Sequence, residues 1–188
     1  KNKELSDRSP SEFLFDELVG ESPKMKKLKD MIVRVAPTDT TVLIQGESGT
    51  GKELIARAIH HHSNRAKYPF VPVDCASISE TVLESELFGH VKGAFTGADS
   101  TALGLIRTAE QGTLFLDEIG ELSIGMQAKF LRTLQERIVR PVGSTKNHAV
   151  DIRIVAATNR NLLDEVSAKK FRQDLYYRLS TVTLTSPP

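Results

Sequence analysis

The chain has 188 residues, 39% of them hydrophobic and 26% charged, a balance typical of one globular α/β domain with a sizeable core. Its formal net charge of +1 argues against a general electrostatic grip on nucleic acid. No apolar stretch approaches the roughly 20 residues of a membrane span, and no secretory signal opens the chain. The single cysteine, Cys75, excludes an internal disulfide and fits a reducing cytoplasm.

The first residues are polar, and an apolar patch at Phe13, Phe15 and Leu18 follows them. We therefore expect residues 1–18 to form the end of a linker and a segment that docks on the domain. Residues 19–188 are expected to form the domain itself. The chain begins with Lys1 instead of methionine, which indicates a fragment of a longer protein.

Strand and helix patterns alternate along the rest of the sequence. Compact apolar runs predict five strands, at residues 41–45, 70–74, 113–117, 152–158 and 181–184. Apolar residues at helical spacing predict helices at residues 23–36, 54–59, 77–87, 103–110, 123–136 and 171–179. This alternation predicts a three-layer α/β fold, in which helices cover both faces of a mostly parallel five-stranded sheet.

Two details of the pattern carry specific expectations. Pro72 removes one backbone donor from the second strand, which weakens that strand as a candidate. Ser77 and Glu80 have the spacing of a capping box, which predicts that a helix opens there.

A glycine-rich turn follows the first predicted strand and precedes a helix. It matches the phosphate-loop pattern G-x-x-x-x-G-K with Gly46, Glu47, Ser48, Gly49, Thr50, Gly51 and Lys52. Glycines allow backbone amides to face phosphate oxygens, and a helix N-terminus adds a favourable field. Lys52 is expected to reach the β- and γ-phosphates of ATP. Glu53 stands where serine or threonine usually contacts Mg²⁺, and a plain glycine turn is the alternative interpretation.

The third predicted strand ends in two carboxylates, Asp117 and Glu118. The carboxyl ends of parallel strands face the ligand crevice of such sheets. We expect Asp117 to hold Mg²⁺, directly or through water, and Glu118 to orient and polarise the attacking water. A solvated acidic pair at the end of a strand is the alternative.

A short segment of small residues around one aromatic ring separates two predicted helices. It consists of Gly93, Ala94, Phe95, Thr96, Gly97 and Ala98. A ring flanked by glycines is costly to leave in water and difficult to hold in a rigid core, so the segment is predicted to be a mobile contact loop. Packing of Phe95 in the core is the alternative.

With these motifs in place, the chain resembles the central AAA+ ATPase domain of bacterial enhancer-binding proteins, the NtrC-like activators of sigma-54 RNA polymerase. The resemblance covers nearly all of residues 19–188, and residues 93–98 are its most specific part. It rests on the segments GESGTGKE at 46–53, ELFGH at 86–90, GAFTGA at 93–98, GTLFLDE at 112–118, AATNR at 156–160 and FRQDLYYRL at 171–179. Glutamate after the phosphate-loop lysine is also this family's habit.

The resemblance implies a role for each loop and strand end. Residues 93–98, with Phe95 and Thr96 at the tip, would contact the sigma-54 factor, and residues 140–148 would form a second pore-side loop. Thr158 and Asn159 would sense the γ-phosphate, and Asn159 would belong to the ATP-binding site.

Two arginines match the family's arginine fingers, which reach the nucleotide of a neighbouring subunit. They are Arg172 and Arg178. A finger supplied in trans offsets transition-state charge and requires an oligomer, so the resemblance implies a ring hexamer. Ordinary surface arginines are the alternative, since spacing alone does not aim a side chain across an interface.

The sequence departs from the family in two respects. Asp74 stands where relatives more often have the asparagine that couples the catalytic glutamate to the contact loop; a carboxylate there would repel Glu118 or shift a proton equilibrium. The chain also ends before the helical lid, and it holds neither the receiver nor the DNA-binding module of longer relatives. DNA would therefore be bound only through a domain outside this chain.

Two other features have plain interpretations. Adjacent residues of a helix point in different directions, so His60, His61 and His62 cannot chelate one metal together, and a solvated helix end is the better account. Cys75 is expected to be a small buried thiol.

The sequence therefore predicts an ATPase that remodels the closed sigma-54 polymerase complex, with Mg²⁺ as cofactor and no membrane partner. Three alternatives stay open: a AAA+ remodeller of another target, a nucleotide-gated interaction module with negligible turnover, and a direct DNA-binding domain. Weak or absent turnover is expected of this chain by itself, because the lid is missing.

Overall fold

The computed structural model describes Leu18 and residues 20–188. Most of the predicted linker and docking segment, including Phe13 and Phe15, lies outside the described residues. Leu18 is 5% exposed and belongs to a buried cluster with Leu28 and Ile32.

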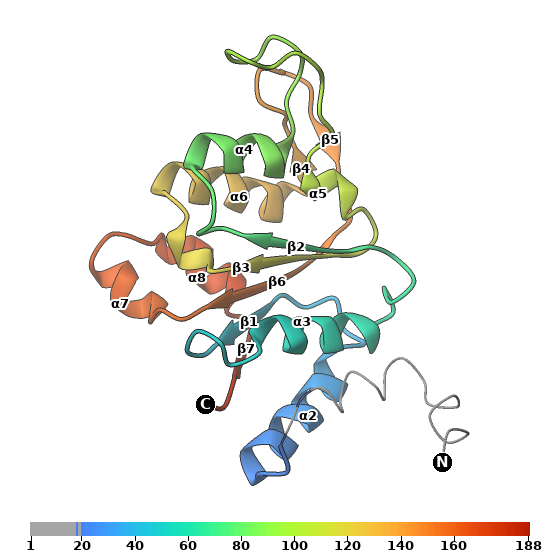
Figure 1. The fold of residues 1–188 in the computed structure, drawn as a ribbon, viewed down its shortest axis with the longest axis vertical. Coiled ribbons are helices and arrows are strands. Elements are labelled where there is room, and N and C mark those ends of the chain that lie inside the picture. Colours follow the sequence, from blue (N-terminus) through green and yellow to red (C-terminus); the bar gives the residue numbers. More distant parts are fainter. Residues whose placement is uncertain (1–17, 19) are drawn as a thin grey trace.

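Five strands form a fully parallel sheet in the order β2-β3-β6-β1-β7 (Figure 1). They are β1 (Val42–Gln45), β2 (Phe70–Asp74), β3 (Thr113–Asp117), β6 (Arg153–Thr158) and β7 (Val182–Thr185). Every predicted strand is present to within one residue at either end. Strand β2 contains Pro72 and lies at the edge of the sheet, where a missing backbone donor is tolerated.

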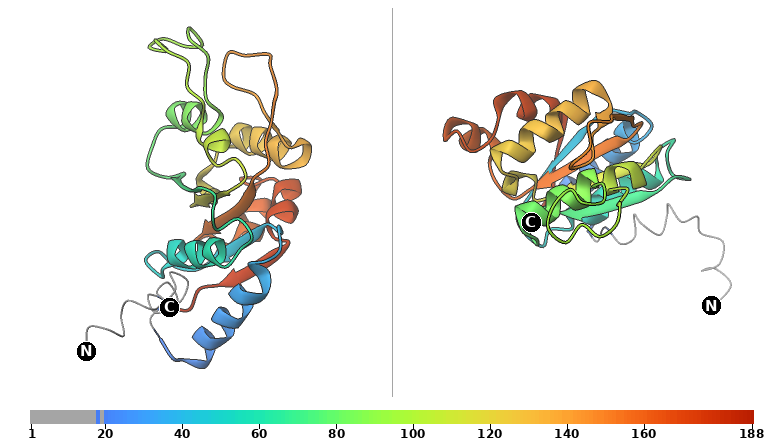
Figure 2. Two further views of the ribbon diagram at one scale, coloured as in Figure 1. Left: turned by 90° about the vertical axis from the view of Figure 1, so that its right-hand side faces the viewer. Right: turned by 90° about the horizontal axis from the view of Figure 1, so that it is seen from above.

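Helices cover both faces of the sheet, which confirms the predicted three layers (Figure 2). On one face pack α2 (Pro23–Val35) and α3 (Lys52–His61). The other face holds α4 (Glu80–Phe88), α5 (Leu105–Thr108), α6 (Ile124–Glu136), α7 (Leu162–Ser167) and α8 (Gln173–Leu179).

Alternate residues of the central strands supply the two apolar clusters. On β3, Leu114 and Leu116 face the α6 side, whereas Phe115 faces α3, and all three are fully buried. Burial on both faces explains why these strands are continuous apolar runs.

Three small elements were not predicted. They are the 3-10 turn η1 (Ile119–Glu121), the helix α7, and the hairpin of β4 (Ile138–Val139) with β5 (His148–Ala149). Each is too short to show a periodicity; α7 has only Leu162 buried and begins at Asn161, whose side chain accepts two backbone hydrogen bonds.

The predicted capping box is wrong. The hydroxyl of Ser77 donates to the carbonyl of Asp74, 3.2 Å away, so it closes the turn after β2 instead of capping a helix. Helix α4 begins three residues later, after Ser79. The carboxylate of Glu80 accepts a hydrogen bond of 2.5 Å from Ser123, which precedes α6.

The interpretation of the three histidines as a solvated helix end is wrong for His60. Its side chain is 2% exposed, and its Nδ1 lies 2.9 Å from the hydroxyl of Thr113 on β3. Burial, assisted by the neighbouring His61, lowers the pKa of His60 to about 4. His61 is exposed, and within the described part of the chain no three His, Cys, Asp or Glu residues gather as a metal site.

Cys75 is 4% exposed, as expected, and burial raises the pKa of its thiol to about 12. A buried arginine was not foreseen. Arg153 on β6 donates to the carbonyls of Val35 and Ala36 at 3.0 and 2.6 Å, and so closes the C-terminal end of α2.

Candidate functional site

The predicted phosphate loop leaves the end of β1 and runs into the first turn of α3. The amide of Gly46 donates to the carbonyl of Thr158 at 3.2 Å, which joins the start of the loop to the neighbouring strand β6. Gly49 and Gly51 both have φ near +80°, a conformation that other residues rarely adopt. Helix α3 begins at Lys52, so the loop lies at a helix N-terminus, where anions are favoured.

Lys52 is folded over its own loop. Its ammonium group donates to the carbonyls of Gly46 and Glu47, each at 2.9 Å, and lies 3.8 Å from a carboxylate oxygen of Glu118. The side chain is only 5% exposed. Two of its three donors therefore stabilise the loop, and the charge faces the acidic end of β3.

Asp117 and Asp74 end adjacent strands and are paired in the sheet register. Burial raises the pKa of Asp117; the negative charge of Asp74 adds to this effect, and Lys52 opposes it. The negative charge of Asp74 thus bears on Asp117, and the effect on Glu118 that the sequence suggested stays a prediction. The carboxylate of Asp74 also accepts a hydrogen bond of 2.9 Å from the amide of Ala76.

Glu118 follows β3, contacts the residue that follows β6, and has an unusual backbone conformation. Its φ of +52° is rare for a residue with a side chain, a strain that tends to occur at functional sites. Its carboxylate accepts a hydrogen bond of 3.3 Å from the amide of Asn159. The amide side chain of Asn159 in turn donates to the hydroxyl of Ser48 in the phosphate loop at 3.1 Å.

The ends of β1, β3 and β6 thus meet in one place. Three separate motifs predicted Lys52, Glu118 and Asn159. Lys52 and Asn159 each contact Glu118, and Asn159 also contacts Ser48 of the loop. Thr158 is fully buried, and its hydroxyl accepts a hydrogen bond from the amide of Arg160 at 3.0 Å.

A cleft of about 370 Å³ opens at this edge of the sheet, a size suited to a small ligand. It is lined by Ser48, Gly49, Gly51, Lys52, Glu53, Asp74, Ala76, Asp117 and Glu118. The carboxylate of Glu53 accepts hydrogen bonds of 2.7 and 3.0 Å from Arg57, one turn later on α3.

These groups fit a nucleotide with Mg²⁺. Glycine amides and a lysine suit phosphates, and Mg²⁺ is commonly held by one or two carboxylates together with substrate phosphates instead of by a complete protein cage. Asp117 at the rim supplies such a carboxylate.

The predicted contact loop projects from the far end of the molecule, beside the turn that connects β4 and β5 (Figure 1). Gly93 and Gly97 have positive φ, and Phe95 is 36% exposed. The Phe95 ring packs against the ring of His90 in a T-shaped arrangement, with centroids 5.0 Å apart. The alternative of a core position for Phe95 is therefore not supported.

The two projecting loops are joined at their base. The amide of Val142 donates to the carbonyl of Gly89 at 2.9 Å, and the amide of Val91 donates to the carbonyl of Val142 at 3.2 Å. A side chain at Gly143 would meet that of Ala94 at 2.6 Å, so the loops are in close contact. Movement of one loop should therefore be transmitted to the other.

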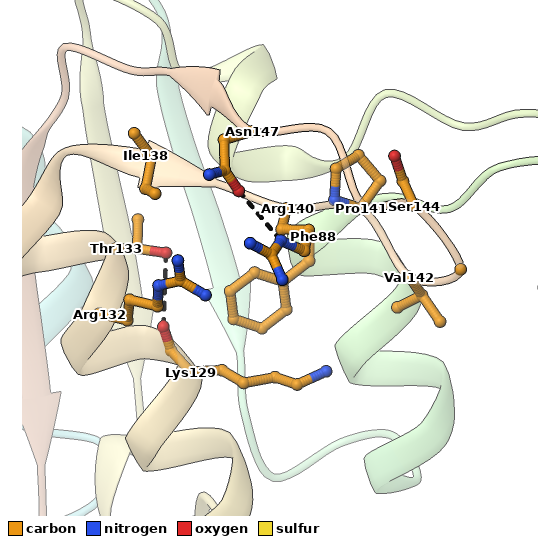
Figure 3. A pocket seen from close by; sticks show the side chains of 11 residues that line it. Phe88, Lys129, Arg132, Thr133, Ile138, Arg140, Pro141, Val142, Ser144 and Asn147 are labelled. Atoms are coloured by element: carbon orange, nitrogen blue, oxygen red, sulfur yellow. Dashed lines mark hydrogen bonds between the residues drawn. The ribbon is translucent and has the colours of Figure 1, made fainter.

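A second cavity, of about 310 Å³, lies beneath the β4–β5 turn (Figure 3). Three basic side chains, Lys129, Arg132 and Arg140, line it around the ring of Phe88. Arg140 donates to the side chain of Asn147 at 3.0 Å, which closes the turn. This cavity shares no lining residue with the cleft at the phosphate loop, so the two are separate sites.

The predicted arginine fingers lie outside the cleft of their own chain. Arg172 immediately precedes α8, and its guanidinium pairs with Asp174 at 2.8 Å. Arg178 donates weakly to the carbonyl of Leu134 at 3.4 Å.

No helix in the described part of the chain is both long enough and apolar enough to cross a membrane.

Comparison with known proteins agrees with this geometry. The family model described as the Sigma-54 interaction domain matches residues 18–185. The chain belongs to this family. The resemblance inferred from the motifs is therefore confirmed.

The relatives of this Sigma-54 interaction domain are longer regulators. The transcriptional regulatory protein ZraR of Klebsiella oxytoca is 58% identical over 171 residues, which are 91% of this chain and 39% of ZraR. The crystal structure of NtrX from Brucella abortus in complex with ADP is 41% identical with a TM-score of 0.84, over 94% of this chain and 38% of NtrX. The chain thus spans less than half the length of these relatives.

A more distant structure shows the fold alone. The P-loop NTPase domain of a sigma-54 activator from E. coli is 20% identical, with a TM-score of 0.60 over 90% of this chain and 99% of that one. The three-layer architecture is thus shared with that P-loop NTPase domain, as the predicted fold requires.

Proposed function

We propose that this chain is the ATP-binding and ATP-hydrolysing domain of a sigma-54-dependent regulator in the bacterial cytoplasm. It would couple hydrolysis to remodelling of the closed sigma-54 RNA polymerase complex. The observation that carries the proposal is that Lys52 and Glu118 line one cleft beside the glycine loop, while Asn159 contacts two of its lining residues, Glu118 and Ser48. Membership of the Sigma-54 interaction domain family supports the choice of target.

Each side chain at the cleft has a task that its position supports. The amides of the loop and Lys52 bind the phosphates of ATP, and Glu118 orients a water for attack on the γ-phosphorus. Mg²⁺, when bound at Asp117, would offset phosphate charge. Asn159 contacts both Glu118 and Ser48, so it is suited to sense whether the γ-phosphate is present.

The neighbouring subunit supplies the remaining charge. Arg172 and Arg178 lie outside the cleft of their own chain, and as trans fingers they would complete the cleft of the next copy in a ring hexamer. Such a guanidinium raises phosphoryl-transfer rates by roughly 10³-fold or more. Arg172 would have to exchange its partner Asp174 for nucleotide.

The path from the cleft to the contact loop is short in the sequence. Asp74 ends β2 at the rim of the cleft, its turn leads into α4, and α4 leads to His90 and the Phe95 loop. Displacement of the β2–α4 turn on ATP binding would therefore move Phe95 toward the sigma factor, and the joined β4–β5 turn would follow.

Nucleotide binding tests the site. Calorimetry with ADP and Mg²⁺ should show binding to the chain and none to Lys52→Ala, because this variant loses the only lysine of the cleft lining. Lys67→Ala, a substitution at an exposed position, is the matched control and should bind as the unmodified chain does. Unchanged affinity of Lys52→Ala would refute the proposed site.

Capture of sigma-54 tests the partner. With ADP and aluminium fluoride, the chain should retain sigma-54 on an affinity resin, and Phe95→Ala should release it while still binding ADP. Tyr68→Ala removes an exposed ring elsewhere and should retain capture. Normal capture by Phe95→Ala would refute the role of the loop. Nucleotide-dependent capture without phosphate release, even at high protein concentration, would favour a gated interaction module over an ATPase.

A further inference from the structure

Ser186, immediately after β7, is a buried polar residue that none of the sequence motifs includes. It is 5% exposed. Its amide donates to the carbonyl of Gln45 at 2.7 Å, at the end of β1. Its hydroxyl lies 2.7 Å from the carbonyl of Thr50 and 3.4 Å from that of Pro187, so the shorter distance marks the main hydrogen bond. One residue therefore contacts both ends of the phosphate loop.

The contact is closely packed as well as hydrogen bonded. A β-carbon added to Gly46 would lie 2.8 Å from the β-carbon of Ser186, closer than carbon atoms approach without displacement. Ser186 thus occupies the space behind the first glycine of the loop. The cleft, on the other side of the loop, does not include Ser186 in its lining.

Two side chains from outside the turn hold carbonyls of the loop. Those of Gly46 and Glu47 accept hydrogen bonds from Lys52, whereas that of Thr50 accepts one from Ser186. The carbonyl oxygen of one residue and the amide hydrogen of the next point in opposite directions, because the peptide bond is planar and trans. Since the Thr50 carbonyl is held toward Ser186, the amide of Gly51 is directed the opposite way, and Gly51 lines the cleft.

We propose that Ser186 is a positioning residue of the nucleotide site: its hydroxyl holds the Thr50–Gly51 peptide so that the Gly51 amide faces the phosphates. The inference rests on the proposed nucleotide function of the same cleft. It links the end of β7 to phosphate binding, so the segment that follows β7 is mechanically connected to the loop.

Three variants separate hydrogen bonding from packing and from general effects on β7. Ser186→Ala removes the hydroxyl, and Ser186→Cys keeps the approximate shape but donates only weakly. Thr185→Ala is the matched control, because Thr185 is the exposed last residue of β7, next to Ser186 and outside the cleft lining. We expect ADP to bind Ser186→Ala about fivefold more weakly than the unmodified chain, the size of one hydrogen bond. Ser186→Cys should resemble Ser186→Ala, and Thr185→Ala should bind normally.

A second readout follows individual amides by ¹⁵N-edited NMR during ADP titration. In Ser186→Ala the shift of the Gly51 amide on ADP binding should shrink, while that of Gly49 should persist, a difference that mere destabilisation would not produce. The inference about Ser186 would be wrong if Ser186→Ala bound ADP as tightly as the unmodified chain. It would also be wrong if Ser186→Cys bound ADP fully with an unaltered Gly51 shift. Neither result would affect the proposed nucleotide function. An unmodified chain that binds no ADP would overturn the proposed function as well.

Discussion

Acidification should destabilise the fold through His60, which lies in the last turn of the helix that begins at Lys52. Its ring is 2% exposed and 2.9 Å from the hydroxyl of Thr113 on β3. Burial, with a contribution from His61, lowers the pKa of His60 from 6.5 to about 4. The folded protein therefore keeps this ring neutral in a pH range where the unfolded chain protonates it.

The sign and size of the effect follow from this difference. As the pH falls below 6.5 the unfolded chain takes up a proton that the folded chain accepts only near pH 4, so the free energy of unfolding decreases. At about 1.36 kcal/mol per pKa unit, the full effect is ~3 kcal/mol. By about pH 5 the expected loss relative to about pH 7.5 is ~2 kcal/mol.

Urea unfolding followed by circular dichroism at these two pH values measures the loss. His60→Gln removes the titrating group, so this variant should lose ~2 kcal/mol less than the unmodified chain on going to about pH 5. His61→Gln, at the exposed neighbour, should retain most of the pH dependence. Parallel stability profiles of His60→Gln and the unmodified chain would refute the reasoning, whatever their absolute stabilities.

Other substitutions test the cleft and the joined loops. Asp74→Asn removes a negative charge that raises the pKa of Asp117, so this pKa should fall and Mg²⁺-dependent ADP affinity should persist to lower pH; identical calorimetric pH profiles would contradict this. Gly46→Ala places a β-carbon 2.8 Å from two side chains and should cost ~1–3 kcal/mol of stability in urea unfolding; an unchanged midpoint would show that the loop adapts. Gly143→Ala would bring a methyl group against Ala94. This variant should capture less sigma-54 while its affinity for ADP is retained. Undiminished capture would show that the β4–β5 turn does not affect the function of the Phe95 loop.

Much of the candidate site could be predicted because its motifs are contiguous. The phosphate loop needs glycines at fixed positions between a strand and a helix, and Gly49 and Gly51 do have positive φ. Asp117 ends β3 after the apolar residues Leu114, Phe115 and Leu116, and Glu118 follows it, so the acidic pair marks the end of the strand. In each case the residues that define the feature are covalent neighbours, so the pattern is visible without the fold.

The errors concern side chains whose partners lie far along the chain or outside a regular pattern. His60 was assigned to solvent because its partner Thr113 is 53 residues away. Ser77 was assigned to a helix cap, although its hydroxyl closes the turn after β2. Ser186 was overlooked because its contact with the phosphate loop spans 136 residues.

The amino-acid sequence alone determined the alternation of strands and helices and the phosphate loop, since these depend on local periodicity and spacing. The family was recognised from the resemblance of short contiguous segments to those of known proteins. The tertiary structure alone decided which strand ends meet. Strands β1, β3 and β6 are separated by long segments of chain yet lie side by side, because packing on both faces of the sheet sets their order. That order brings Asn159 to Ser48 and Ser186 to Thr50, contacts between polar groups that no run of neighbouring residues encodes.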